Sequence, residues 1–304
     1  MKIRRTKIAV VAAAAALALA GCGDAGSDDD GGDGDGGGGG FSPEVVENAA
    51  DEFDDGTRMK EIAEAGTVKI GVKFDQPGIG FKAAGADAPE GFDPNMGQIL
   101  AAKLGIAPDK IEWVETISDN REPFLQNSTV DFVIASYSIT DERRQVVGQA
   151  GPYYVTGQQL LVQESNTDIN GPDDLAGKKV CSVTGSTSIA TVEEKYGATP
   201  AGFDTYSQCV DQLKTGSVDA VTTDGAILAG YAAQDPGTTK VVGDPFSEER
   251  YGIGYNKDSA ELCEFINDTL EGAFEDGDWE AAFDDTLGKS GIDTPDQPTV
   301  DPCP

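Results

Sequence analysis

A buried strand, a hydroxyl-rich turn and a helix start follow one another in the chain and could together bind a small anion. The apolar run 130–134 is typical of a buried strand, and Thr140 is typical of a helix N-cap. Arg143 would then lie in the first helical turn, where a cation is unfavourable by about 0.3–1 kcal/mol. An anion in front of the helix would remove that penalty, so we predict a carboxylate site at Arg143. The alternative is a surface Arg143 that pairs with Asp141 or Glu142.

Strands and helices alternate through most of the chain, which predicts an α/β fold with mostly parallel sheets. Pro43 is typical of a first helical position and predicts a helix over 43–65. In chain order, the further expected elements are 68–74, 95–104, 111–114, 121–126, 130–136, 141–147, 159–162, 179–183, 188–196, 207–215, 220–223, 225–233, 240–242, 252–255, 260–274 and 279–287. The chain is expected to leave a first lobe near Thr156 and return near Arg250, with a ligand site between the lobes. Two independent domains in tandem are the alternative.

The first 42 residues predict export and attachment to a membrane. Four cations precede an apolar run, 8–20, which is too short to span a bilayer. The sequence Leu-Ala-Gly-Cys that ends at Cys22 is similar to a bacterial lipobox, so 1–21 is predicted to be a signal peptide and Cys22 to carry lipid. Gly and Asp dominate 22–42, which predicts a flexible tether. An ordinary signal peptide with a chance cysteine is the alternative.

Composition excludes several classes of function. The chain has a formal net charge of −32 and contains no His. Such acidity disfavours nucleic acid and anionic lipid as partners, and the lack of His excludes a Ser-His-Asp triad and His metal sites. The cysteines show no Cys-x-x-Cys pattern, so zinc is not expected. No other metal and no cofactor is expected. Besides Cys22, the cysteines can form two disulfides in three pairings, which involve Cys181, Cys209, Cys263 and Cys303.

Six short motifs connect this chain with a known family. The chain resembles the family 3 extracellular solute-binding proteins, which deliver polar amino acids to ABC transporters. The motifs that carry the resemblance are 68–74, 91–95, 125–131, 135–144, 151–154 and 173–180. One departure is Ser128, where the family usually has Gly. Three further segments are more narrowly similar to actinobacterial glutamate-binding lipoproteins, namely 73–78, 120–123 and 181–187.

The resemblance implies a two-lobed, periplasmic-binding-protein-like fold of type II, with a two-strand hinge. Its expected parts are the first part of lobe 1, lobe 2, and the return to lobe 1 with the tail, over 43–156, 157–250 and 251–304. A disulfide between lobes would clamp a hinge that must move. The expected pairs are therefore Cys181–Cys209 and Cys263–Cys303, the second of which would attach the proline-rich tail to the domain.

The resemblance also implies a site for an α-amino acid. Arg143 would bind the α-carboxylate in a bidentate manner. Ser136 and Ser138 would contact both the carboxylate and the ammonium, Thr187 would offer a backbone N–H to the carboxylate, and Asp224 would accept the ammonium. The alternatives are satisfied turn hydroxyls for the serines and helix N-caps for Thr187 and Asp224.

Two cations are expected to select the ligand's side chain. Lys73 ends the first strand, where family members that bind glutamine or basic amino acids often carry Asp. A cation there favours an anionic side chain, and Arg121 is a second candidate for the same carboxylate. The alternative for Arg121 is a structural pair with Glu122 or Asp119.

Together these features predict a monomeric, lipid-anchored receptor on the extracytoplasmic face of the cell membrane. It would bind an acidic amino acid, L-glutamate first, and deliver it to an ABC transporter permease without catalysis. Glutamine and aspartate stay open as ligands. The alternative functions are a dehydratase of cyclic amino or keto acids on the same scaffold, with Glu142 as its acid, and a sensory or adhesin-like binding module.

Overall fold

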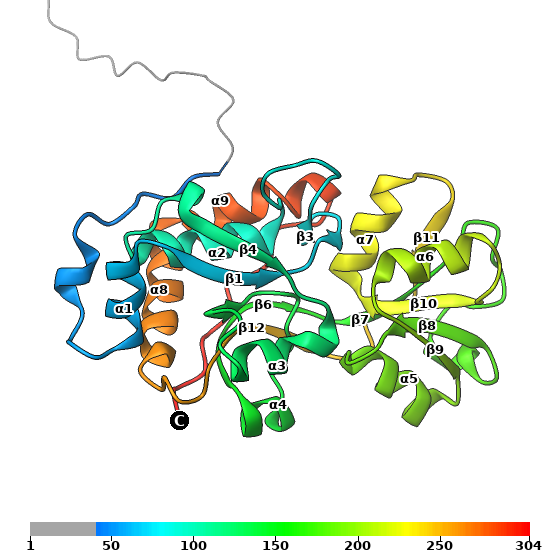
Figure 1. Ribbon diagram of the computed structural model, residues 1–304. Helices are drawn as coiled ribbons and strands as arrows, with labels where there is room; N and C mark the ends of the chain where they lie inside the picture. The colour runs from blue at the N-terminus through cyan, green and yellow to red at the C-terminus, as the bar shows by residue number, and fades with distance from the viewer. Residues whose placement is uncertain (1–40) are drawn as a thin grey trace, which may run out of the picture. The chain divides into compact units, whose positions relative to one another are not determined.

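The structure is a computed structural model that describes residues 41–304. The predicted signal peptide 1–21, the lipid site at Cys22 and nearly all of the predicted tether 22–42 lie outside the described residues. Within the described part of the chain, no helix has the length and apolar character needed to cross a membrane. The described residues form two five-stranded sheets with helices packed against them (Figure 1).

The first sheet combines strands from both ends of the described chain. Its strand order is β4 (Ile111–Glu115), β1 (Val68–Val72), β5 (Phe132–Val133), β12 (Glu249–Tyr255) and β6 (Gly148–Thr156). β1 pairs in parallel with β4 and β5, whereas β12 runs antiparallel to β5 and β6. The helices of this part are α1 (Arg58–Ala65), α2 (Phe92–Lys103), α3 (Arg121–Gln126), α4 (Asp141–Val146), α8 (Leu262–Asp276) and α9 (Asp278–Asp284). A short hairpin follows β1 and consists of β2 (Asp75–Gln76) and β3 (Gly80–Phe81).

The second sheet comes from one continuous stretch of chain. Its strand order is β11 (Thr239–Val242), β7 (Gln158–Gln163), β10 (Ala220–Asp224), β8 (Lys179–Val183) and β9 (Thr199–Phe203). β10, β8 and β9 pair in parallel, and β7 runs antiparallel to both of its neighbours. The helices of this part are α5 (Thr187–Tyr196), α6 (Tyr206–Lys214) and α7 (Gly225–Gln234).

Two chain crossings join the sheets, as Figure 1 shows around β6, β7 and β12. The first runs from β6 into β7 through Gly157, where any Cβ would clash with the carbonyl oxygen of Ser247. The second enters β12, whose first residue, Glu249, lies opposite Thr156. The prediction of a two-lobed α/β fold is confirmed. The sheets are more evenly mixed than expected, because the crossing strands pair antiparallel, and the lobe boundaries at 156 and 250 stay predictions.

Aromatic side chains form the centre of the first lobe's core. Phe92 of α2 contacts Tyr153, Tyr154, Trp279 and Phe283 with ring centroids 5.6–6.0 Å apart. The indole N–H of Trp279 donates to the Tyr153 carbonyl at 2.7 Å, so the buried ring has its polar atom satisfied. This packing connects α2 and α9 to β6, one of the two crossing strands.

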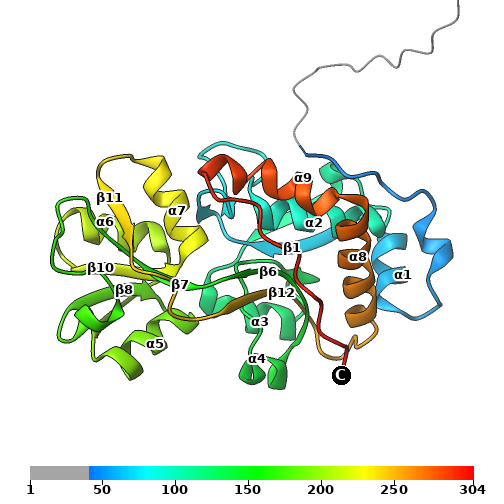
Figure 2. The same cartoon turned by 180° about the vertical axis from the view of Figure 1, so that it is seen from behind.

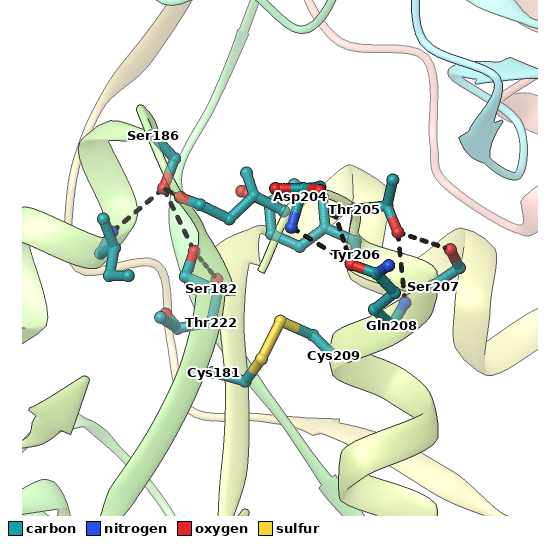
Figure 3. The surroundings of a disulfide bond; sticks show 12 residues. Cys181, Ser182, Ser186, Asp204, Thr205, Tyr206, Ser207, Gln208, Cys209 and Thr222 are labelled. Carbon is teal, nitrogen blue, oxygen red and sulfur yellow. Dashed lines mark hydrogen bonds between the residues drawn. A yellow bond between two sulfur atoms is a disulfide. The ribbon is translucent and has the colours of Figure 1, made fainter. Parts of the chain in front are cut away.

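Each lobe contains one disulfide, and both pairs are those expected. Cys181–Cys209 joins β8 to α6 (Figure 3), and Cys263–Cys303 joins the C-terminal tail to α8. Figure 2 shows the tail ending near α8. The tail is also held by Asp301, which pairs with Arg144 at 2.8 Å and with Arg250 at 2.5 Å. The prediction that neither disulfide crosses between the lobes is therefore confirmed.

The largest local error of the sequence analysis concerns the helix expected over 43–65. The structure has only a 3₁₀ turn at Ala49–Glu52, and α1 begins at Arg58 after Thr57, whose hydroxyl accepts the N–H of Lys60. Asn48 and Gly56 have φ of 55° and 85°. Left-handed residues at these two points interrupt a continuous helix. The edge strand β9 was missed, because Pro200 and Gly202 weaken the strand signal there.

Candidate functional site

One pocket is lined by side chains from both sheets and contains most of the predicted site. Six of the seven predicted ligand-binding residues line it, namely Arg121, Ser136, Ser138, Arg143, Thr187 and Asp224. Four come from segments of the first sheet and two from the second. Their assignment as ligand contacts stays a prediction, and the geometry of each is described below.

Arg143 is positioned by the helix start that the sequence predicted. Thr140 caps α4 by accepting the Arg143 N–H at 3.2 Å, which places the side chain in the first turn. The guanidinium donates to the Ser138 carbonyl at 2.7 Å, and its Nε lies 3.1 Å from Oε1 of Glu122. Its partner is therefore Glu122 of α3, and not the adjacent acids that the alternative interpretation named. The group lies inside the pocket wall instead of on the surface.

Arg121 is buried and satisfied almost entirely by backbone carbonyls. It donates to the carbonyls of Ser118, Ala135 and Ser136 at 3.1–3.2 Å. Burial, with the charge of Arg143 nearby, lowers the pKa of Arg121 to about 10. The expected alternative of a carboxylate pair is not what holds this side chain. It organises the turn at Ser136 instead.

Both guanidinium groups meet at one carbonyl oxygen of the second lobe. Arg121 Nη2 and Arg143 Nη2 donate to the Gly185 carbonyl at 3.1 and 3.0 Å. Both groups also lie over the Tyr137 ring, at 4.6 and 4.9 Å from its centroid. Gly185 has φ of 77°, and an added Cβ would clash with Asp119. Glycine therefore allows this close approach of the two lobes.

Asp224 lies at the carboxyl end of β10, directly before α7. Its side chain makes no capping bond to the helix, so the N-cap alternative does not explain it. Tyr251 donates to Oδ2 at 2.6 Å, and Oδ1 is buried without a hydrogen-bond partner among residues 41–304. Burial, and second the charge of Glu249, raises the pKa of Asp224 to about 7. An unpartnered buried carboxylate oxygen is an unusual feature, and it lines the pocket.

The two predicted serines belong to one turn that a buried acid supports. Ser136 has φ of 43°, a left-handed conformation that is rare outside glycine. Its N–H donates to Asp93 Oδ2 at 2.7 Å, and Tyr153 donates to the other oxygen of that carboxylate at 2.6 Å. Ser138 follows and uses its hydroxyl differently, by donating to Glu249 Oε2 at 2.6 Å.

Thr187 is the first residue of α5, and Ser186 takes the N-cap position. The Ser186 hydroxyl accepts the Ile189 N–H at 3.2 Å, so the capping role proposed as the alternative for Thr187 belongs to its neighbour. Figure 3 shows Ser186 beside Ser182 of β8, above the Cys181–Cys209 disulfide. The Thr187 hydroxyl donates to Glu249 Oε2 at 3.0 Å.

Lys73 is the one predicted residue that does not itself line the pocket. It follows β1, is 3% exposed, and its Nζ donates to Ser118 Oγ at 2.9 Å. Ser118 does line the pocket, so Lys73 lies immediately behind its wall. Burial, and second the charge of Arg121, lowers the pKa of Lys73 to about 7.

The sequence analysis missed several residues of the site. Ser118, Tyr206 and Ile227 line the pocket, and Glu249 and Tyr251 hold its polar groups. The alternation Glu249, Tyr251, Ile253, Tyr255 on one face of β12 was a signal that could have indicated an inward-facing acid. No cluster of acids or cysteines suited to a metal ion occurs within the described chain.

Comparison with known proteins identifies the family. Residues 68–289 match the bacterial extracellular solute-binding proteins, family 3. The chain belongs to this family. A similar family member is the glutamate-binding protein GluB of Corynebacterium efficiens, 39% identical over 79% of this chain and 85% of the relative. A glutamine-binding protein of Geobacillus stearothermophilus is 35% identical over 69% of this chain and 80% of the relative.

A solved structure agrees with this assignment. The structure of an ancestral arginine-binding protein bound to glutamine matches this one with a TM-score of 0.69 and 37% sequence identity. The match covers 73% of this chain and 98% of the ancestral protein. The two relatives above are named as amino acid-binding proteins. This family 3 protein is therefore an extracytoplasmic amino acid-binding receptor, and the relatives favour this function over the dehydratase alternative.

Proposed function

We propose that this receptor binds an acidic amino acid, most specifically L-glutamate. The observation that carries the proposal is the distribution of charge around the pocket. Three cations, Lys73, Arg121 and Arg143, lie on one side, and Asp224 offers an unpartnered oxygen on the other. Glutamate has two carboxylates and one ammonium, so its charges complement this arrangement.

Arg143 and Thr187 are proposed to bind the α-carboxylate. The two arginines direct N–H groups at the Gly185 carbonyl, which is an acceptor with only partial charge. A ligand carboxylate would compete for the same donors and form stronger, charge-assisted hydrogen bonds. The first turn of α5, with Thr187 at its start, would add a backbone N–H and the positive end of a helix.

Lys73 is proposed to select the side chain of the ligand. Arg121 already donates to four carbonyls, whereas Lys73 has the Ser118 hydroxyl as its hydrogen-bond partner among the described residues. A buried ammonium with few partners gains most from a nearby anion. A γ-carboxylate at Ser118 would therefore keep Lys73 charged, whereas the amide of glutamine would not.

The relatives support an amino acid ligand and leave the choice between acid and amide to this site. The GluB relative is named for glutamate and the Geobacillus relative for glutamine. We further propose that Cys22 anchors the protein to the cell membrane through lipid, that residues 22–42 tether it, and that the monomer delivers its ligand to an ABC transporter permease.

Calorimetric titration tests the ligand proposal. The chain from residue 22, with Cys22→Ser to prevent acylation, is unfolded and refolded to remove bound ligand and is then titrated with L-glutamate, L-glutamine, L-aspartate and L-arginine. Glutamate is expected to bind at least about tenfold tighter than glutamine, since one buried charge pair distinguishes them. Tighter binding of glutamine or arginine would retain the receptor and overturn the role of Lys73.

A further inference from the structure

Glu249 is a buried acid at the hinge. It is the first residue of β12 and lies opposite Thr156 of β6 in the register. The residue is 5% exposed, and its Oε1 accepts a hydrogen bond from Ser247 Oγ at 2.9 Å. A buried carboxylate at a hinge needs partners for its second oxygen as well.

Two hydroxyl groups from opposite walls of the pocket supply those partners. Ser138 Oγ donates to Glu249 Oε2 at 2.6 Å, and Thr187 Oγ1 donates to the same oxygen at 3.0 Å. A hydroxyl has one proton to donate and two lone pairs that accept. Because Glu249 Oε2 accepts both hydrogen bonds, both hydroxyl protons point toward it. The Ser138 and Thr187 oxygens are then left with acceptor capacity alone for a ligand in the pocket.

Asp224 provides a third acceptor in the same pocket. Its Oδ2 is occupied by Tyr251, and its Oδ1 has no partner among residues 41–304. Glu249 is close enough for its charge to raise the pKa of Asp224, in addition to the larger effect of burial. The pocket therefore presents three acceptors, and a primary ammonium has three N–H donors.

We propose that Glu249 is a positioning residue for the ligand's α-ammonium, because it fixes the Ser138 and Thr187 hydroxyls as acceptors beside Asp224. The inference rests on the proposed function, since it takes the ligand to be an α-amino acid. Without Glu249, either hydroxyl could rotate and donate its proton to a carboxylate. With Glu249, the site distinguishes an amino acid from a dicarboxylate of the same length.

The test compares L-glutamate with glutarate, which has the same two carboxylates and no ammonium. Glu249→Gln keeps the size of the side chain but replaces one accepting oxygen by an NH2 donor, so one of the three hydroxyls that donate to Glu249 must turn its proton away. The neutral carbonyl oxygen that remains also holds the other two protons less strongly than a carboxylate does. Binding of glutamate is measured by calorimetry and binding of glutarate by competition with glutamate. The expected result is at least about a tenfold loss of glutamate affinity, with glutarate affinity within about threefold of wild type.

Two further variants separate this role from a structural one. Ser247→Ala removes the contact to the other oxygen of Glu249 and is expected to leave the glutamate-to-glutarate ratio within about twofold of wild type. Thr187→Val removes one acceptor together with its hydrogen bond to Glu249, while the acid itself stays in place, and it is expected to lower that ratio. In the double variant, the change in this ratio should be smaller than the sum of the changes in Thr187→Val and Glu249→Gln, because both substitutions act on one hydrogen-bonded group.

The results that would overturn the role of Glu249 differ from those that would overturn the ligand proposal. Equal losses for glutamate and glutarate in Glu249→Gln, with a normal ratio in Thr187→Val, would mean that Glu249 only supports the hinge. No loss in either variant would also overturn the inference. If wild type prefers glutamine, the ligand proposal fails, and the same comparison is made with glutamine and its desamino analogue, so that Glu249 is still tested.

Discussion

The two walls of the pocket differ in charge and in how their polar groups are satisfied. On the first wall, Arg121 and Arg143 are held by carbonyls of their own lobe before any ligand is considered. On the second wall, Asp224 keeps one oxygen without a partner among the described residues. The cationic wall is thus preorganised by its own backbone, whereas the acidic wall carries an unsatisfied group that a ligand can pair.

This difference suggests an order of events during binding. A carboxylate that approaches the first wall meets donors that are already oriented, so it loses little to rearrangement. The gain on the second wall comes only when the lobes close and Asp224 reaches the ammonium. Closure about the hinge is therefore expected to depend on the ammonium more than on the carboxylates.

Arg143→Ala should have the largest effect on affinity. It removes the proposed partner of the α-carboxylate, and truncating one member of a buried charge pair costs about 2–5 kcal/mol. Titration with L-glutamate measures the loss. Arg144→Ala is the matched control in the same helix, because Arg144 pairs with Asp301 in the tail and does not line the pocket. Equal affinities for Arg143→Ala and wild type would refute the carboxylate site.

Asp224→Asn should weaken binding by about 2–3 kcal/mol, and it should also stabilise the unliganded protein above about pH 7. The folded-state pKa of Asp224 is raised, so its favourable contribution is present at low pH and is lost as the pH rises through about 7. The neutral amide lacks this loss. Thermal unfolding from about pH 4 to about pH 9 measures the difference.

Asp235→Asn is the control for that variant, because Asp235 is an exposed acid near the end of α7 and pairs with Lys214. Asp235→Asn should leave glutamate affinity unchanged, and it should not stabilise the protein at high pH as Asp224→Asn is expected to do. If Asp224→Asn were less stable than wild type at high pH, burial would not be the main influence on this carboxyl group.

Lys73→Met should weaken glutamate binding by about 1.5–3 kcal/mol and leave glutamine binding within about 0.5 kcal/mol, because only glutamate places a charge at this position. Titration of both ligands gives the answer. Lys69→Met in β1, the strand that directly precedes Lys73, is the control, since the Lys69 side chain is 51% exposed and pairs with Glu112 at the surface. Equal losses for the two ligands would assign Lys73 a structural role.

Replacing Cys263 and Cys303 together by Ser should have the smallest effect on binding. The disulfide joins the tail to α8, far in sequence from the pocket residues, and closes a loop with a separation of 40 residues. Its loss should lower the free energy of unfolding by about 2–4 kcal/mol while glutamate affinity stays within about twofold. Calorimetric unfolding and titration measure the two quantities. A large loss of affinity would show that the tail supports the site.

Local sequence signals correctly predicted the helix start that positions Arg143, whereas the residues that were missed depend on contacts between distant parts of the sequence. Thr140 and Arg143 belong to one capped helix start, so their arrangement follows from neighbouring residues. Glu249 receives hydrogen bonds from Ser138 and Thr187, which lie 111 and 62 positions away. Contacts of that separation arise only when both crossings and both sheets are in place, and no local pattern encodes them.

The hydrogen-bond partners of Lys73 and Arg121 also could not be read from the local sequence. Charge and the family resemblance made both residues candidates for the ligand's side-chain carboxylate, but the sequence could not show which groups they hydrogen-bond. Arg121 donates its hydrogen bonds to backbone carbonyls of three turns, whereas Lys73 donates to one hydroxyl group. The hydrogen bonds therefore favour Lys73, the first candidate of the sequence analysis, over Arg121, the second candidate, as the residue that selects the ligand's side chain.

The most direct test of ligand selection by Lys73 is the ratio of glutamate to glutamine affinity from about pH 6 to about pH 9. Titration of Asp224 affects both ligands through their common ammonium and therefore cancels in the ratio. Lys73, with its pKa lowered to about 7, loses its charge as the pH rises. The account predicts a strong preference for glutamate below that pH and a falling preference above it. A ratio that does not change with pH, or that favours glutamine throughout, would contradict it.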